Sequence, residues 1–227
     1  MPHQRAPVLL LTRPEAEARR FEASVRALAP GEWRAVVAPL LEIVPMAAVE
    51  VPEDVPIFTS AQAVPFAGTG SGRLAWCVGP RTAAAARAAG WSPKEGGGDA
   101  EALFAAILAA PPEPLVHLRG VHSRGALAER LRAAGRTVAE RVVYDQRARP
   151  LTAEAGTALA GAAPVLAPVF SPRSASLLSG AVGNPAAPFR VIALSVAAAE
   201  PLRRWSPVVA ARPDGEAMAE AAAALLR

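Results

Sequence analysis

Hydroxyl, glycine and arginine residues recur at the points where short apolar runs of this sequence end. They are Thr12, Arg13, Thr59, Ser60, Gly79, Thr82, Arg119, Gly120, Ser171 and Ser195. If each run is a strand that leads into a helix, the first backbone N–H groups of that helix lack partners, and these side chains add further donors. Such donors bind carboxylates. The same residue types also serve as ordinary helix N-caps, so both interpretations stand at this point.

Tyr144 is the only tyrosine of the chain and lies in the segment RVVYDQ (141–146). A phenol stays neutral at pH 7 and donates a hydrogen bond, which suits it to act as a weak acid. The alternative is a packing role at the edge of a strand. The neighbouring carboxylates, Glu140 and Asp145, are expected to face solvent.

Other chemistries lack the residues they need. The single cysteine, Cys77, lies in an apolar run, which excludes a disulfide framework and a cysteine-based zinc site. His117 and His122 do not have the spacing of a helical metal pair. The sequence contains no G-x-S-x-G and no phosphate-binding G-x-x-x-x-G-K-[ST], and GTGSG (68–72) follows a helix-like segment rather than a strand. We therefore expect no metal and no cofactor.

Composition places the chain among globular proteins. It has 227 residues, 52 % of them apolar, and a formal net charge of +4. Of its 24 basic residues only Lys94 is a lysine, and the arginines are scattered rather than clustered, so we expect no nucleic-acid partner. No apolar run reaches the roughly 18 residues of a membrane span, and the N-terminal segment does not resemble a signal peptide. We expect a cytoplasmic protein without a membrane partner.

Apolar runs of strand length alternate with segments of helical periodicity. The predicted strands are 8–12, 35–39, 55–60, 74–79, 115–120, 137–146, 167–171 and 189–195. The predicted helices are 15–28, 61–67, 81–89, 100–110, 123–134, 152–159, 174–178, 197–204 and 215–226. This alternation predicts an α/β fold with parallel sheets flanked by helices.

The chain also contains an internal repeat. The similar pairs of segments are 55–64 with 167–176, 76–93 with 191–207, 99–103 with 214–218, and 8–43 with 115–146. Their order is A, B, A′, B′, which predicts two similar lobes. In such a protein a ligand binds in the cleft between the lobes, at the carboxyl ends of the strands, where the hydroxyl and glycine positions described above lie.

Short motifs spread over nearly the whole chain resemble one known family. They are LLLTRP (9–14), PLLEI (39–43), IFTSAQAV (57–64), VGPRTAAAARAAG (78–90), LRGVHSRGALAERLRAAG (118–135), VVYDQ (142–146), VFSP (169–172) and VIALSVAAAEPLR (191–203). In this order and spacing they resemble the uroporphyrinogen-III synthases of heme biosynthesis. These lyases cyclise hydroxymethylbilane, a linear tetrapyrrole, to uroporphyrinogen III with inversion of ring D and loss of water.

The resemblance implies two α/β lobes joined by two extended crossover segments, with a cleft between them. Lobe 1 would comprise residues 1–37 and 149–227, and lobe 2 residues 46–141. The linkers would be residues 38–45 and 142–148. Segment A would then pack with B′, and A′ with B, in agreement with the repeat.

The resemblance also implies roles for particular residues. Tyr144 matches the family's tyrosine, the weak acid near the leaving hydroxyl. Arg119 and Arg124, in R-G-x-x-x-R, would pair with substrate carboxylates, although Arg124 can equally be an ordinary residue of a first helical turn. The second lobe departs from the pattern, because Leu194-Ser195-Val196 lacks the glycine and the threonine of Gly79-Pro80-Arg81-Thr82.

The implied partner is the small linear tetrapyrrole, and the chain is expected to be a monomer that needs no cofactor. Transient contact with the enzyme that makes hydroxymethylbilane is a further expectation. Two other functions are compatible with an α/β chain. The first is a non-catalytic bilobal sensor of a tetrapyrrole or another polycarboxylate. The second is a nucleotide-binding enzyme, for which a phosphate loop after a strand is missing.

Overall fold

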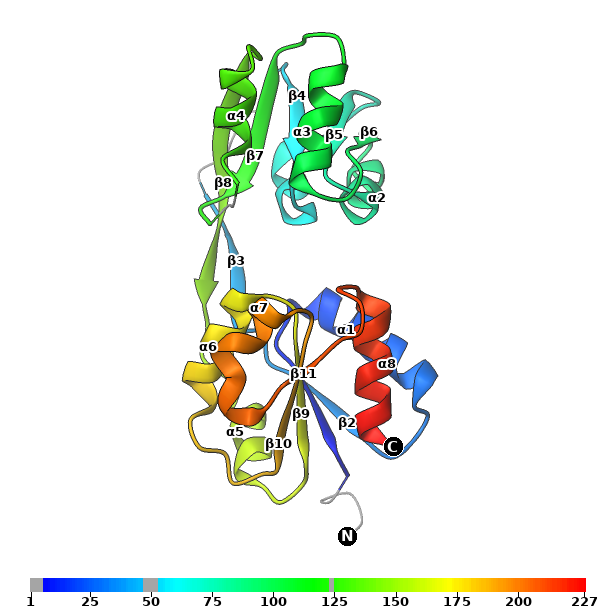
Figure 1. Cartoon of the computed structure of the whole chain (residues 1–227), viewed down its shortest axis with the longest axis vertical. Helices are drawn as coiled ribbons and strands as arrows, with labels where there is room; N and C mark the ends of the chain where they lie inside the picture. The colour runs from blue at the N-terminus through cyan, green and yellow to red at the C-terminus, as the bar shows by residue number, and fades with distance from the viewer. Residues whose placement is uncertain (1–5, 47–52, 123–124) are drawn as a thin grey trace. The chain divides into compact units, whose positions relative to one another are not determined.

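The computed structural model describes residues 6–46, 53–122 and 125–227 (Figure 1). The chain divides into two compact units, and each is described by itself. Unit 1 comprises residues 1–42 and 148–227, and unit 2 comprises residues 43–147. Both boundaries fall inside the segments 38–45 and 142–148, where we predicted linkers.

Unit 1 is built on a five-stranded sheet in the order β11-β10-β9-β1-β2, and its neighbouring strands run parallel. The strands are β1 (Val8–Leu11), β2 (Arg34–Val37), β9 (Val165–Val169), β10 (Phe189–Ala193) and β11 (Val208–Val209). The helices are α1 (Glu15–Leu28), α5 (Ala153–Ala160), α6 (Pro172–Val182), α7 (Val196–Ala199), the 3₁₀ helix η3 (Glu200–Trp205) and α8 (Gly215–Leu226).

Alternation along β1 gives unit 1 a core on each face of its sheet. Val8 and Leu10 pack into one core with residues of α5, α6, α7 and η3. Leu9 and Leu11 point the other way, into the core formed with α1 and α8. All four side chains are fully buried. A continuous apolar run is what a parallel strand covered on both faces requires.

Unit 2 carries a six-stranded sheet in the order β3-β8-β7-β4-β5-β6. The strands are β3 (Leu41–Pro45), β4 (Val55–Phe58), β5 (Leu74–Cys77), β6 (Ser92–Glu95), β7 (Leu115–Gly120) and β8 (Val138–Ala148). The helices are the 3₁₀ helix η2 (Ala61–Ala67), α2 (Pro80–Ala88), α3 (Ala100–Ala109) and α4 (Leu127–Ala133). The pairs β8–β7, β7–β4, β4–β5 and β5–β6 are parallel.

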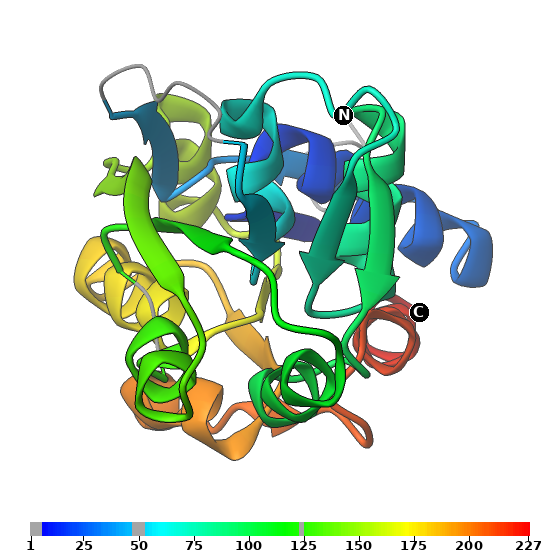
Figure 2. The same cartoon turned by 90° about the horizontal axis from the view of Figure 1, so that it is seen from above.

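Helices cover both faces of this sheet as well, with η2 and α2 on one side and α3 and α4 on the other (Figure 2). Phe58 packs on the side of η2 and α2, together with Leu118 of the neighbouring strand. Ile57, one residue earlier, packs on the side of α3 and α4. Because side chains alternate along a strand, the residues that follow β4 and β7 are also divided between these two sides.

The two sheets correspond strand for strand. Reading unit 1 as β2-β1-β9-β10-β11 and unit 2 as β8-β7-β4-β5-β6 matches each strand with its counterpart in the sequence repeat. The strands β1 and β2 of segment A therefore lie in one sheet with those of B′, and the strands of A′ in one sheet with those of B. β3 is additional to this common pattern.

Three local predictions need correction. The helix expected from residue 123 begins at Leu127, because Gly125 and Ala126 have positive φ angles of 89° and 43°, which a helix does not accommodate. The short strands β6 and β11 were not predicted, since β6 (SPKE) has no strand-like apolar pattern and β11 has only two residues. β8 continues to Ala148, two residues beyond the predicted end of this strand at residue 146.

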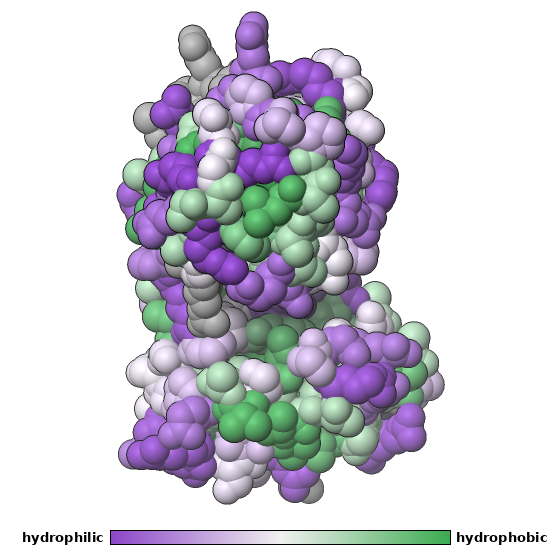
Figure 3. Space-filling model, turned by 45° about the horizontal axis from the view of Figure 1, so that its top comes forward, coloured by the Kyte–Doolittle hydropathy of each residue, from purple (hydrophilic) through white to green (hydrophobic). Residues whose placement is uncertain are grey.

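None of the described helices is both long and apolar enough to cross a membrane. On the face shown in Figure 3, hydrophilic and hydrophobic residues are interspersed. The exposed large apolar side chains in the described parts of the chain are Leu28, Met46, Leu108, Val121, Val196, Val208 and Val209.

Two glycine substitutions test the packing with opposite expected signs. A Cβ atom on Gly70 would lie 2.4 Å from the backbone nitrogen of Trp91, a buried residue, so we expect Gly70→Ala to lower the free energy of unfolding by about 1–3 kcal/mol. A Cβ on Gly156, inside α5, meets no atom within 4 Å, so Gly156→Ala should raise it by about 0.5–1 kcal/mol. Urea unfolding measures both. Equal stability of the Gly70→Ala variant and the unsubstituted protein would contradict the packing described.

Candidate functional site

The predicted site residues of unit 2 gather at one edge of its sheet. Thr59 and Ser60 follow β4, Gly79 follows β5, and Arg119 and Gly120 close β7. These three strands are neighbours in the order β7-β4-β5 and run parallel, so their carboxyl ends lie together. The structure therefore brings these five predicted residues together at one sheet edge.

A β-bulge in β8 brings Tyr144 to the same edge. Arg119 of β7 pairs with Val142, but the next residue, Gly120, pairs with Tyr144, so Val143 is the extra residue. As a result the successive residues Val143 and Tyr144 both belong to the core on the side of η2 and α2. Regular alternation would have sent one of them to the opposite face.

The ring of Tyr144 lies directly on the backbone of Gly120. A Cβ atom on Gly120 would come within 2.6 Å of Tyr144 Cε2 and 2.7 Å of Cζ, so only glycine leaves room for the ring. Phe66 of η2 stacks on the ring, with centroids 5.9 Å apart and an interplanar angle of 20°. Tyr144 retains only 5 % of its surface exposure. Its position is thus fixed on two sides.

The phenol hydroxyl shares hydrogen bonds with the Ser60 hydroxyl and the Gly120 backbone. Burial raises the pKa of Tyr144 above its ordinary value of 10.0, and the two hydrogen bonds oppose this shift. The phenol is therefore neutral at physiological pH. A neutral, oriented phenol is a weak acid that keeps its proton until a stronger base develops beside it.

Two glutamines connect this cluster to β8. The Ser60 hydroxyl accepts a hydrogen bond from the Gln62 backbone N–H (3.3 Å), and Gln146 Nε2 donates to Gln62 Oε1 (2.8 Å). Gln62, Gln146 and Phe66 were not predicted as site residues. The first two lie inside the motifs IFTSAQAV and VVYDQ, so polar residues within matching motifs were the signal that could have identified them.

A second polar cluster occupies the other face of the sheet, on the side of α3 and α4. His117 is buried, with 3 % exposure, and its Nε2 lies 3.1 Å from Thr59 Oγ1. Arg119 Nε donates to Glu140, whose second oxygen accepts from Arg132 (3.3 Å). The expectation that Glu140 simply faces solvent is therefore wrong. Arg119 also donates to the Gly120 carbonyl oxygen (2.9 Å).

Burial and neighbouring charges shift the pKa values of this second cluster. Burial is the main reason that the pKa of His117 is lowered to about 4; Glu140 opposes this shift, and the charge of Arg119 contributes to it. The pKa of Glu140 itself is below its usual value. Partial burial raises it, but the hydrogen bond and charge of Arg119 outweigh that effect. His117 is therefore neutral at physiological pH, and Arg119 is already engaged by a carboxylate of the protein. Arg124 lies outside the described residues.

The first turn of α2 provides further donors. Gly79 precedes this helix and, having no side chain, leaves the N–H groups of the first turn without a side-chain cap. Thr82 lies in that turn and is 5 % exposed. Arg81 precedes it. A Cβ on Gly79 would lie 3.1 Å from the Cα of Gly98, a tight contact that only a small shift of Gly98 would relieve.

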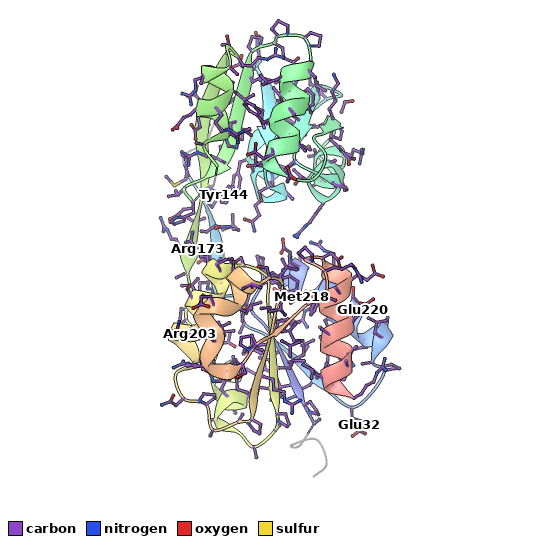
Figure 4. The ribbon with its side chains drawn as sticks, in the orientation of Figure 1. Glu32, Tyr144, Arg173, Arg203, Met218 and Glu220 are labelled. Atoms are coloured by element: carbon purple, nitrogen blue, oxygen red, sulfur yellow. The ribbon has the colours of Figure 1, made fainter. Side chains whose placement is uncertain are left out.

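In unit 1 the predicted residues also share one sheet edge, after β1, β9 and β10. Ser171 and Ser195 are N-caps: their hydroxyl oxygens accept from the Ser174 and Ala198 N–H groups, at 3.1 and 3.3 Å. The N-cap interpretation therefore holds for both. Ser171 is followed by Pro172 and Arg173, the first two residues of α6 (Figure 4).

Thr12 and Arg13 of unit 1 are held within the protein. Thr12 is buried, with 3 % exposure. Arg13 pairs with Glu17 at 2.5 Å, and its guanidinium lies 4.1 Å from the centroid of the Phe170 ring. Among the described residues, no group of three or more His, Cys, Asp or Glu side chains is arranged to hold a metal ion.

Comparison with known proteins identifies the family. The family model described as uroporphyrinogen-III synthase HemD matches residues 22–220. The chain belongs to the uroporphyrinogen-III synthase family. The resemblance inferred from the short motifs is thereby confirmed. A search of the curated proteins returns no match.

Solved structures agree in fold. A uroporphyrinogen-III synthetase of Helicobacter pylori superposes with a TM-score of 0.66 at 17 % identity, over 97 % of this chain and 99 % of that chain. A mutant uroporphyrinogen III synthase of Thermus thermophilus gives 0.51 at 17 % identity, over 98 % of this chain and 100 % of that one. At this identity they show that the α/β fold is that of uroporphyrinogen-III synthases.

Because Tyr144 is the only tyrosine, its ionisation can be followed directly. We expect the ultraviolet absorbance of phenolate to report a pKa above 10, because the ring is buried. Gly120→Ala should push the ring out of place and move this pKa back toward 10. A phenol that titrates at or below 10 in the unsubstituted protein would contradict the burial described.

His117 predicts a particular acid sensitivity. Its pKa is about 4 in the folded state and ordinarily 6.5, so the unfolded state binds more protons between these values. Stability should therefore fall as the pH drops from 6.5 to 4, by up to about 3 kcal/mol. His117→Gln removes the titrating group. The free energy of unfolding of each protein is measured against pH, and the profile of the variant is subtracted from that of the unsubstituted protein, which cancels the contribution of the carboxylates that both share. A difference that does not change between pH 6.5 and 4 would contradict the burial of a neutral His117.

Proposed function

We infer that the chain is a uroporphyrinogen-III synthase, a lyase that cyclises hydroxymethylbilane to uroporphyrinogen III in heme biosynthesis. Membership of this family over residues 22–220 supports the inference. The observation that carries the mechanism is the neutral phenol of Tyr144, held by Ser60 and Gly120 at the carboxyl edge of the sheet. No observation favours a non-catalytic sensor.

We propose that Tyr144 is the weak acid of the reaction. The phenol donates a hydrogen bond to the hydroxymethyl oxygen of the substrate and transfers its proton to it. The bond between the hydroxymethyl carbon and this oxygen breaks, and the oxygen leaves as water. The resulting azafulvene is attacked by the substituted carbon of ring D, which gives a spiro intermediate. Fragmentation and re-closure invert ring D, and the proton lost as the last pyrrole regains aromaticity restores the phenol. The net change is the loss of one water.

The substrate carries most of the reactivity itself, because its pyrroles are rich in electrons. The task of the protein is to hold the flexible chain so that the substituted carbon reacts, which is catalysis by positioning. A single acid then contributes only part of the rate. This explains why a buried tyrosine with an ordinary hydroxyl, rather than a strongly shifted acid or base, suits the site.

We propose that strand-end donors of each unit bind the acetate and propionate arms of the substrate. They are Thr12, Arg13, Thr59, Ser60, Gly79, Thr82, Arg119, Gly120, Arg124, Ser171 and Ser195. Arg119 would have to share its guanidinium with Glu140.

We further propose that the chain acts as a cytoplasmic monomer without a cofactor. A single, fully buried cysteine, Cys77, is consistent with a reducing compartment. Hydroxymethylbilane closes without an enzyme to the type I isomer, so brief contact with the enzyme that makes it would limit this side reaction.

The product isomer tests the function directly. Purified protein is given freshly prepared hydroxymethylbilane, and the oxidised products are separated by chromatography. We expect the type III isomer to predominate, with the buffer control giving type I. Type I alone in the presence of the protein would refute the proposed activity.

Tyr144→Phe tests the role of the hydroxyl. The variant keeps the ring that fills the space over Gly120, so its fold should persist, and we expect the rate of type III formation to fall by about 10-fold to 100-fold, at the low end of general acid effects. Thermal unfolding of the variant serves as the control for folding. Full turnover in a folded variant would remove the hydroxyl from the mechanism.

A further inference from the structure

The proposed function leaves one buried titratable residue of the site without a role. His117 lies in the middle of β7, and its Nε2 is 3.1 Å from Oγ1 of Thr59, the first residue after the neighbouring strand β4. Ile57 pairs with His117 in the strand register, and Thr59 follows Ile57 by two residues. The side chains of Thr59 and His117 therefore project on the same face of the sheet. The hydrogen bond therefore joins a fully covered imidazole to a half-buried hydroxyl at the sheet edge.

The surroundings of the imidazole determine which nitrogen carries its proton. The ring is neutral at physiological pH, so only one of its two nitrogens bears hydrogen. His117 Nδ1 is buried and finds no hydrogen-bond partner among the described residues. A proton on Nδ1 would leave a buried N–H donor unpaired, and such groups are rare because their desolvation is costly. The proton therefore belongs on Nε2, and only a lone pair is left without a partner.

We propose that His117 is a positioning residue that donates from Nε2–H to Thr59 Oγ1 and thereby leaves the threonine hydrogen for a carboxylate oxygen of the substrate. This inference rests on the proposed function, in which Thr59 binds an arm of the tetrapyrrole. Without His117 the hydroxyl would rotate freely and offer a donor or an acceptor with equal ease. With it, Thr59 presents a donor, which selects an anionic acceptor.

The neighbouring charges keep this arrangement constant. Glu140 lies opposite His117 in the strand register, but it accepts hydrogen bonds from Arg119 and Arg132. The carboxylate is thus neutralised by partners other than the imidazole. The apolar side chains of Leu127 and Leu131 on α4 and of Leu103 and Ile107 on α3 belong to the core on this face.

Steady-state kinetics separate positioning from structure. We expect His117→Leu to raise the KM for hydroxymethylbilane by about threefold to tenfold, which is the factor in binding that one oriented hydrogen bond contributes. The kcat should change by less than about twofold. His117→Gln places an amide N–H near the same point and should recover most of the loss. A fall in kcat with unchanged KM would overturn the proposal.

A double-mutant cycle tests whether His117 acts through Thr59. Thr59→Val keeps the shape of the side chain and removes the hydroxyl, so it should raise KM by a similar factor. In the Thr59→Val background, His117→Leu should then add no further increase. An equal increase in both backgrounds would show that His117 acts through general packing, which contradicts the positioning role.

The tautomer provides a readout that does not depend on activity or on a variant that folds poorly. Long-range ¹⁵N correlation spectra of the unsubstituted protein at neutral pH should show His117 protonated on Nε2, with the signal assigned by its loss in His117→Gln. Protonation on Nδ1 in a protein that forms type III product would overturn the positioning role alone. Formation of type I product only would overturn the proposed function instead.

Discussion

One extra residue in β8 determines the geometry of the candidate site. Because Val143 bulges out of the pairing with β7, Tyr144 lies opposite Gly120 and enters the core on the side of η2. The absence of a side chain on Gly120 lets the ring lie on the backbone, and Phe66 covers the ring's face. The neutral phenol, its hydrogen bond to Ser60 and its place at the carboxyl edge all follow from this register shift.

The parallel sheet distributes the remaining polar groups. Since side chains alternate along β4 and β7, Ser60 lies with Tyr144 on one face, while Thr59 lies with His117 on the other. The first face supplies an acid and the second an oriented donor. Interactions within unit 2 fix the side-chain positions of both clusters, so their geometry exists before any ligand binds. Catalysis by positioning requires such a preformed geometry.

Much of the fold and part of the site could be predicted from the sequence. Apolar runs such as VLLLT predicted the parallel sheets, and the A, B, A′, B′ repeat predicted two similar lobes, whose strand orders correspond in the structure. Strand-to-helix transitions predicted where hydroxyls gather. The bulge at Val143 had no sequence signal, because VVY continues an apolar run whichever way the residues point. The pairing of Arg119 with Glu140 and the link between Gln62 and Gln146 are contacts across the fold that local patterns do not encode.

The central claim is that the ligand meets the protein at Tyr144, on the carboxyl edge of the sheet. Its most direct test is a nuclear magnetic resonance titration of the intact protein with uroporphyrin III, the stable oxidised form of the product. Our account predicts that the ring signals of Tyr144, the only tyrosine, shift in step with those of Thr59 and Gly120. Unchanged Tyr144 signals, with shifts confined to the pocket lined by Pro7, Pro164 and Pro188, would contradict it.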